Sequence, residues 1–206
     1  MFSAEELAGL TFRSLQSTDQ NDLAYLAVTG KIELPIRDWL GAFITREYPE
    51  LTAAREFRRR DLAILQNGVP LAVIEGKLWI SFEANFPSKL HNANPKEGLV
   101  AASKSDILKM NEIWVSTGCQ RFTSTVLFAA DIRQIDARHL PAIKYPNWHH
   151  RGLKDGIDLE AAHSSGVNRY REAMSSYGTC SSLRLFRGQV FGMDVVADVV
   201  ICKIAS

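Results

Sequence analysis

The chain of 206 residues is 46% hydrophobic and carries 24 basic and 23 acidic side chains, for a formal net charge of +1 at pH 7. This length and composition allow one well-packed domain. The near-neutral charge excludes a strongly basic surface, so any affinity for nucleic acid must depend on local patches. No apolar stretch approaches the length of a membrane span.

The three cysteines, Cys119, Cys180 and Cys202, are odd in number and lack the CxxC spacing of a zinc site. They indicate a reducing compartment rather than a disulfide-stabilised secreted domain. The first residues, MFSAEELAGL, contain neither the basic region nor the apolar core of a signal peptide. We therefore expect a soluble, cytoplasmic protein.

The N-terminal quarter of the chain predicts helices. A short helix over 3–10 is followed by a polar loop over 11–21 and a second short helix over 23–28. Apolar residues at helical spacing predict a third helix over 33–48, which Pro49 stops.

Residues 58–80 predict two buried strands joined by a turn. The apolar runs Leu62–Leu65 and Leu71–Ile74 flank Asn67-Gly68, which is a strong turn signal. A strand with one solvated face should alternate apolar and polar residues, and these runs do not. Both strands therefore belong in the interior of a sheet.

The second half of the chain repeats the alternation of helix and strand. The pattern predicts helices over 96–114 and 159–177 and strands over 121–132, 182–191 and 193–204. The first of these helices and the strand after it leave enough chain for a parallel crossover.

Three ionisable residues interrupt the apolar strands: Asp61, Glu75 and Lys77. Such side chains are rarely buried unless they are paired, bound to a metal or required for chemistry. Carboxylate oxygens are ligands that Mg²⁺ prefers, and a bound metal ion activates water for attack on a phosphodiester. Lys77 follows Glu75 by two residues and so points to the same face, where it can orient that water or neutralise developing charge.

The register of the hairpin decides whether the two acids can cooperate. With a strict two-residue loop, Asp61 would lie opposite the residue before Glu75, and the two side chains would point to different faces. A three-residue loop or a bulge near Gly68 brings Asp61 across from Glu75, with Gln66 paired to Pro70. We expect the second arrangement, with the two carboxylates within metal-bridging reach.

The spacing of Asp61, thirteen residues and then Glu75-Gly76-Lys77 resembles the D…(D/E)xK signature of the PD-(D/E)XK, or restriction-endonuclease-like, nuclease superfamily. Upstream residues extend the likeness to the nuclease region of type I restriction-enzyme motor subunits and related defence nucleases: Glu33-Leu-Pro-Ile-Arg37, Tyr48-Pro49, Glu56 and Arg60-Asp61. The similarity covers residues 31–80. It departs at Arg60, where the signature has Pro.

The resemblance implies an α/β fold with a restriction-endonuclease-like core, which is a mixed central β-sheet flanked by helices in the order αβββαβ. It places this core at about 31–132 and leaves a C-terminal helix and β-hairpin at 136–206. All of 1–206 then forms a single nuclease domain.

The resemblance also implies the roles of the site residues. Catalysis would depend on Asp61, Glu75, Lys77 and Glu33. The metal, Mg²⁺ with Mn²⁺ as a substitute, would be held by Asp61, Glu75, the Gly76 carbonyl and Glu33. The helix acid stays open between Glu33 and Glu47 at the other end of the same helix, since either could be an ordinary surface glutamate.

Two basic clusters are candidates for contact with nucleic acid. One is Arg58, Arg59 and Arg60 at the entry to the first strand of the hairpin, and the other is His149, His150 and Arg151. Either cluster could equally be an ordinary exposed segment.

These patterns favour a Mg²⁺-dependent endonuclease that acts on double-stranded DNA in bacterial defence or DNA processing. A homodimer that cuts both strands would suit an enzyme of this size. Two alternatives stay open: a non-catalytic module on the same scaffold that binds nucleic acid or a partner protein, and a nuclease that acts on RNA.

Overall fold

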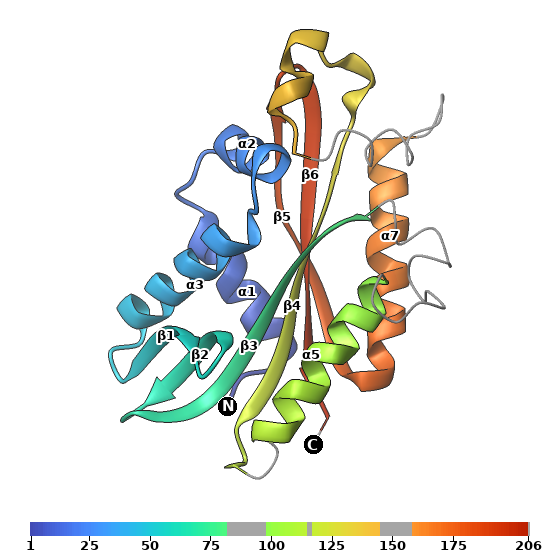
Figure 1. The fold of residues 1–206 in the computed structure, drawn as a ribbon. Coiled ribbons are helices and arrows are strands. Elements are labelled where there is room, and N and C mark those ends of the chain that lie inside the picture. Colours follow the sequence, from blue (N-terminus) through green and yellow to red (C-terminus); the bar gives the residue numbers. More distant parts are fainter. Residues whose placement is uncertain (82–97, 115–116, 145–157, 206) are drawn as a thin grey trace.

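A mixed sheet of six strands forms the centre of this α/β protein, and helices flank it (Figure 1). The computed structural model describes residues 1–81, 98–114, 117–144 and 158–205. Within those ranges no helix is long and apolar enough to cross a membrane. In chain order the elements are α1 (Ala4–Leu15), α2 (Gln20–Thr29), α3 (Glu33–Glu47), β1 (Leu51–Phe57), β2 (Arg60–Gln66), β3 (Val69–Ile80), α5 (Leu99–Trp114), β4 (Gln120–Ala130), η3 (Ile132–Gln134), η4 (Ala137–Ala142), α7 (Leu159–Met174), η5 (Ser175–Tyr177), β5 (Gly178–Val190) and β6 (Met193–Ile204).

The strands lie in the order β1-β2-β3-β4-β6-β5. Strands β1, β2 and β3 form an antiparallel meander. Strand β4 runs parallel to β3, which requires a crossover, and the chain makes it through α5. The C-terminal hairpin then adds β6 antiparallel to β4 and β5 at the far edge.

Two hydrophobic cores lie on the two faces of the sheet. Helices α1, α2 and α3 cover one face with buried side chains such as Leu7 and Leu40. Helices α5 and α7 cover the other face with Met110 and Tyr170 (Figure 1). Strands β4 and β6 are buried almost throughout, which explains why their sequences do not alternate.

The expected helices are present, but α1 is longer than predicted. It continues to Leu15 instead of ending near residue 10, because Leu10, Thr11 and Leu15 are all buried. The Thr11 hydroxyl is satisfied inside the helix, where it donates to the Leu7 carbonyl at 2.8 Å. The loop predicted over 11–21 is therefore wrong for residues 11–15, which belong to α1.

The resemblance implies a third strand in the meander, but the residue pattern does not locate it. Strand β1 has the sequence LTAAREF, whose charged residues obscure the alternation expected of a strand. Its pairing with β2, from Leu51 opposite Gln66 to Phe57 opposite Arg60, makes the segment extended. Here tertiary pairing overrides a weak local preference.

The β2–β3 turn is a tight two-residue loop. Gln66 pairs with Val69, and Asn67 and Gly68 have φ of 50° and 77°, as the right-handed twist of a two-residue hairpin requires. The predicted pairing of Gln66 with Pro70 is therefore wrong.

The predicted bulge is nevertheless present, a few residues farther along the strand. The register shifts between Ile64 and Leu65, so that Ile64 pairs with Ala72 and Leu62 with Ile74. This shift moves Asp61, which directly precedes Leu62 in β2, toward Glu75.

Strand β3 continues well beyond the end of β2. Its pairing with β2 stops at Ile74, whereas its pairing with β4 continues to Ile80. The second half of β3 is therefore left without a strand partner on the β2 side. We call the place where β2 and β3 separate, just after Ile74, the fork. Asp61, Glu75 and Lys77 all lie there.

Candidate functional site

The carboxylate of Asp61 occupies the fork between β2 and β3. Its Oδ2 accepts a hydrogen bond of 2.6 Å from the Gly76 N–H. Backbone N–H groups of a strand point sideways in the plane of the sheet, so the carboxylate lies at the sheet edge and takes the place of a strand acceptor. Its Oδ1 lies 3.9 Å from Arg37 Nη1 of α3.

Gly76 makes this close approach possible. A Cβ added there would lie 3.2 Å from Asp61 Oδ2, tighter than an ordinary van der Waals contact. The residue between the acid and the lysine of the triplet is therefore small because a carboxylate packs against its backbone.

Glu75 pairs with Arg60, the residue at which the sequence departs from the nuclease signature. Arg60 is buried, and its Nη1 lies 3.4 Å from Glu75 Oε2. Burial, with the negative charge of Asp61 adding to it, nevertheless raises the pKa of Glu75 to about 7. The guanidinium offsets only part of the cost of ionising this carboxyl group.

Lys77 points to the same side of the sheet as Glu75, as its spacing predicts, and meets α5. Its Nζ lies 2.7 Å from Asp106 Oδ2, and Lys109 Nζ lies 3.4 Å from the other oxygen. The Asp106 side chain is only 5% exposed. The signal for Asp106 in the sequence is that it interrupts the buried face of α5, which continues through Met110 and Trp114.

Glu33, in the first turn of α3, faces Asp61 across a small cavity. The cavity has a volume of about 20 Å³, and its other lining residues are polar or small (Arg37, Gly76 and Ser124) and apolar (Ile36, Leu40, Leu62, Ile74 and Val126). Glu33 Oε2 is buried and has no hydrogen-bond partner within the described part of the chain, and burial raises the pKa of this carboxyl group. A space of this size holds about one water molecule or ion.

Glu47 lies at the other end of α3 and is exposed, where it pairs with Arg46 at 3.0 Å. Of the two candidates for the helix acid, Glu33 is the one that shares a cavity with Asp61. Two other residues of the upstream pattern also meet, since Arg37 Nη1 lies 2.6 Å from Glu56 Oε1.

The carboxylates at the fork are contributed from two sides of the sheet. Asp61 and Glu33 border the cavity on the α3 side, whereas Glu75 shares its face with Lys77, which meets α5. Among the described residues no group of three or more His, Cys, Asp or Glu side chains is placed to hold a metal ion. The expected approach of the Asp61 and Glu75 carboxyl oxygens to within bridging reach stays a prediction.

The donor chemistry at the fork suits a hard divalent cation. All of the candidate ligands are oxygen atoms, which Mg²⁺ and Mn²⁺ prefer. Burial raises the pKa of both Glu33 and Glu75, and Glu33 Oε2 has no hydrogen-bond partner among the described residues, so ionisation of either carboxyl group is unfavourable without a further positive charge. A bound cation would supply that charge.

The arginine cluster divides between surface and interior. Arg58 and Arg59 form the exposed turn of the β1–β2 hairpin, with φ of 49° and 66°. Arg58 lies over the rings of Phe57 and Trp114, at 5.5 and 5.6 Å from their centroids. Arg60 points inward to Glu75, so it is not a surface contact. The second cluster, His149, His150 and Arg151, lies outside the described residues.

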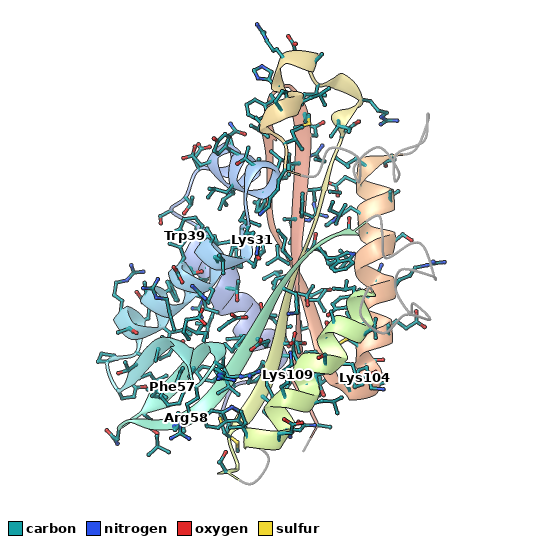
Figure 2. The ribbon with its side chains drawn as sticks, viewed as in Figure 1. Lys31, Trp39, Phe57, Arg58, Lys104 and Lys109 are labelled. Atoms are coloured by element: carbon teal, nitrogen blue, oxygen red, sulfur yellow. The ribbon has the colours of Figure 1, made fainter. Side chains whose placement is uncertain are left out.

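Exposed basic side chains lie on both sides of the fork in Figure 2. Lys31 and Trp39 lie toward α3, and Lys104 and Lys109 follow α5, while Arg58 marks the hairpin. An open groove of about 330 Å³ runs along the free half of β3 and is lined by both Lys31 and Lys77. The overall charge of the chain gave no sign of this local concentration.

A second polar cluster has the Ser–His–Asp arrangement of a hydrolytic triad. His163 Nδ1 lies 2.7 Å from Ser81 Oγ, and Nε2 lies 2.6 Å from Asp198 Oδ2. However, Ser81 and His163 are both 0% exposed, so a substrate cannot reach the hydroxyl.

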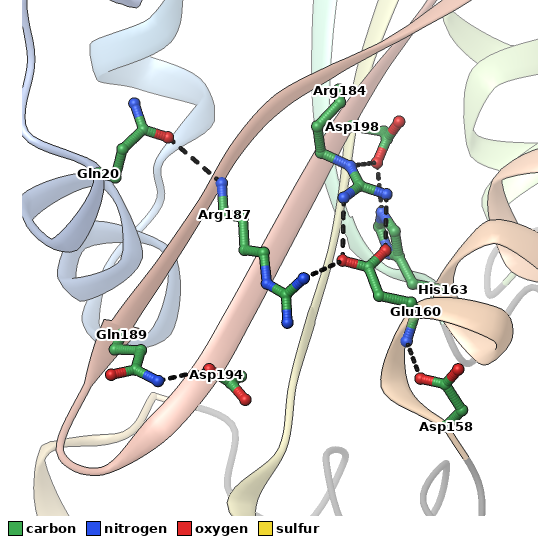
Figure 3. Close-up of polar contacts among 9 residues, drawn as sticks. All are labelled: Gln20, Asp158, Glu160, His163, Arg184, Arg187, Gln189, Asp194 and Asp198. Carbon is green, nitrogen blue, oxygen red and sulfur yellow. Dashed lines mark hydrogen bonds and ion pairs between the residues drawn. The ribbon is translucent and has the colours of Figure 1, made fainter.

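This cluster belongs to a structural network that joins α7 to the C-terminal hairpin (Figure 3). Arg184 donates a hydrogen bond of 2.6 Å to Asp198 and one hydrogen bond to each carboxylate oxygen of Glu160. Burial opposes ionisation of Asp198, but the hydrogen bonds and charges of His163 and Arg184 outweigh it and lower the pKa of that carboxyl group. We therefore assign the cluster to stability rather than to catalysis.

Comparison of the chain with protein-family models, with curated proteins and with solved structures gives no match. The geometry of the site is therefore the basis for a functional proposal.

Proposed function

We propose that this protein is a metal-dependent nuclease of the restriction-endonuclease-like fold that hydrolyses phosphodiester bonds in double-stranded DNA. The observation that carries the proposal is the contact of the Asp61 carboxylate with the Gly76 N–H at the fork of β2 and β3. It depends on a bulge that the nuclease hypothesis requires and that an ordinary two-residue hairpin would lack.

The order of the elements around the fork supports the same proposal. Helix α3, the meander β1-β2-β3, helix α5 and the parallel strand β4 follow the order αβββαβ. In that order the fork lies between the first helix and the crossover helix, and α3 supplies Glu33 while α5 supplies Asp106.

Asp61, Glu33, Glu75 and the Gly76 carbonyl would hold Mg²⁺ or Mn²⁺. The bound ion would supply an acidified water and shield the phosphate charge. Lys77 contributes a positive charge on the same face as Glu75, and Asp106 fixes its position. The exposed residues Arg58 and Lys31 would contact phosphates on either side.

This proposal extends to the setting of the enzyme. We assign it to the cytoplasm, to bacterial defence or DNA processing, and to a homodimer that cuts both strands of a duplex. RNA as the substrate is the closest variant, because phosphate contacts carry no information about the sugar.

A second candidate is a non-catalytic module that binds nucleic acid. The observation in its favour is that protein side chains already pair with two of the signature residues, Arg60 with Glu75 and Asp106 with Lys77. In such a module the fork would serve stability, and the basic rim would hold the phosphates.

A plasmid-nicking assay with Mg²⁺, Mn²⁺ or EDTA separates the two candidates. We expect cleavage that depends on the metal and is lost in Glu33→Ala, whereas Glu47→Ala on the same helix cuts like the wild type. Equal binding of DNA by all three proteins with no cleavage in either metal would favour the binding module. A labelled RNA duplex in parallel distinguishes the two substrates.

A further inference from the structure

Cys180 and Cys202 lie directly opposite each other on β5 and β6, although 21 residues separate them in the sequence. Residues directly opposite on antiparallel strands have Cα atoms about 4.5–5.5 Å apart. A disulfide spans Cα separations of about 4.4–6.8 Å. Both side chains face the core beneath α5 and α7, and both are free thiols.

The two thiols differ in access. Cys202 is buried and its sulfur lies 3.5 Å from the Met174 carbonyl at the end of α7. Cys180 is partly exposed on the edge strand β5. An oxidant in solution therefore reaches Cys180 first.

The two thiols also differ in acidity. Contact with the Cys202 thiol lowers the pKa of Cys180 against the effect of burial, and Arg171 lowers it further. The same contact, together with burial, raises the pKa of Cys202. The thiolate, which is the reactive form, is thus favoured at the more exposed sulfur.

We propose that Cys180 and Cys202 form a redox-active dithiol that a hydroperoxide converts into a cross-strand disulfide. The Cys180 thiolate attacks the terminal oxygen of the peroxide, the O–O bond breaks, and the product is a sulfenic acid with release of an alcohol or water. The Cys202 sulfur then attacks the Cys180 sulfur, while its proton leaves with the displaced hydroxide as water. The net change is two thiols and one hydroperoxide to one disulfide, one water and one alcohol, or two waters with hydrogen peroxide.

The bond would have a regulatory character rather than that of a structural brace. In reducing compartments disulfides are usually transient and sense redox conditions. Formation removes the Cys202 thiol hydrogen and with it the contact to Met174. The end of α7 is therefore the element that registers oxidation, and this inference is independent of any nuclease activity.

Peptide mapping of the intact chain tests the proposal. The reduced protein is treated with hydrogen peroxide, quenched with N-ethylmaleimide and digested with trypsin without reduction. We expect peptides 172–184 and 188–203 to be joined, with the loss of two hydrogens and reversal by dithiothreitol. Cys119, buried ahead of β4 and with its pKa raised by burial, is the internal control and should remain a thiol in peptide 110–121.

Matched variants separate the two sulfurs. Cys202→Ser should stop at a Cys180 sulfenic acid, which dimedone labels, whereas Cys119→Ser should give the same cross-link as the wild type. Wild-type protein that forms Cys180 sulfinic acid without a cross-link would overturn the proposal. Unmodified Cys180, or 172–184 joined to itself between molecules, would overturn it as well.

Discussion

Lys77 Nζ lies 2.7 Å from Asp106 Oδ2, so the lysine of the E-x-K triplet is held by a buried carboxylate from the crossover helix. Lysine has a flexible four-carbon stem, and a fixed partner is needed to hold its charge at one place. Asp106 therefore acts as a positioning residue for Lys77.

Removal of the Asp106 charge tests this relationship. Asp106→Asn should lower the rate of cleavage by up to about a hundredfold, because small displacements of a reacting group have effects of that size. Binding of Mn²⁺ should change little. Lys109→Ala removes the other partner of Asp106 and serves as the control, which should cut normally. A loss of Mn²⁺ binding in Asp106→Asn, measured by calorimetry, would show that Asp106 acts on the metal site instead.

Two substitutions at Asp61 separate its charge from its hydrogen bond. Asp61→Ala leaves the Gly76 N–H without its acceptor, which costs about 1–3 kcal/mol when the group stays buried. Asp61→Asn keeps an acceptor and removes the charge that adds to the raised pKa of Glu75. In EDTA we expect the Ala variant to melt below the wild type and the Asn variant to melt at or above it.

Neither Asp61 variant should cleave DNA if the carboxylate is a metal ligand. Equal melting temperatures for the two variants would instead mean that the contact with Gly76 contributes nothing to stability. Cleavage that survives in Asp61→Asn would remove Asp61 from the catalytic set.

The titration of Glu75 predicts how the stability of the metal-free protein depends on pH. Its pKa of about 7 in the folded state lies above the ordinary value of 4.5, so the folded state binds more protons between these values. Stability should therefore fall as pH rises from about 4.5 to about 7 and level off above that. A shift of this size corresponds to at most about 3.5 kcal/mol for an isolated group.

Thermal melts in EDTA between pH 5 and 8 measure this fall. Glu75→Gln should flatten most of the slope, because the amide does not titrate. Titration with Mg²⁺ at pH 7 should also release protons, since the ion binds the charged form. An unchanged slope in Glu75→Gln would assign the pH dependence to other groups.

A metal ion bound at the fork would compete with Arg60 for Glu75. Its guanidinium lies 3.4 Å from Glu75 Oε2, and the signature has an uncharged Pro at this position. Arg60→Ala should therefore bind Mn²⁺ about tenfold more tightly at pH 8, a difference of about 1.4 kcal/mol. Arg59→Ala, which changes the exposed neighbour in the same hairpin, is the control and should bind as the wild type does.

Calorimetric titration of the wild type and both variants tests the role of Arg60 separately from the existence of the metal site. Equal affinity in the wild type and Arg60→Ala would show that Arg60 does not gate the site and would leave the metal site itself intact. Absence of Mn²⁺ binding in all three proteins would reject the metal-dependent nuclease.

Sequence periodicity determined the local structure of this protein. The runs at 62–65 and 71–74 lie in buried strands, and the turn falls at Asn67-Gly68 as predicted. The spacing of Glu75 and Lys77 placed both side chains on one face. These features depend on neighbours within a few residues, which the order of side chains specifies directly.

The tertiary structure decided every relationship between distant segments. Glu33 and Glu47 belong to one helix, and the sequence did not show which of them faces Asp61; the packing of α3 on the sheet selected Glu33. The bulge was required by a hypothesis, but its position in the strand was fixed only by the pairing of β2 with β3.

The same reason explains the contacts that the sequence concealed. Arg60 was read as part of a basic surface, yet its place opposite Phe57 turned it inward to Glu75. Asp106 meets Lys77 only because the crossover lays α5 over β3, and Cys180 meets Cys202 only through the register of the last hairpin. Such pairs join residues far apart in the chain, and their contact depends on strand order and register, which local patterns do not encode.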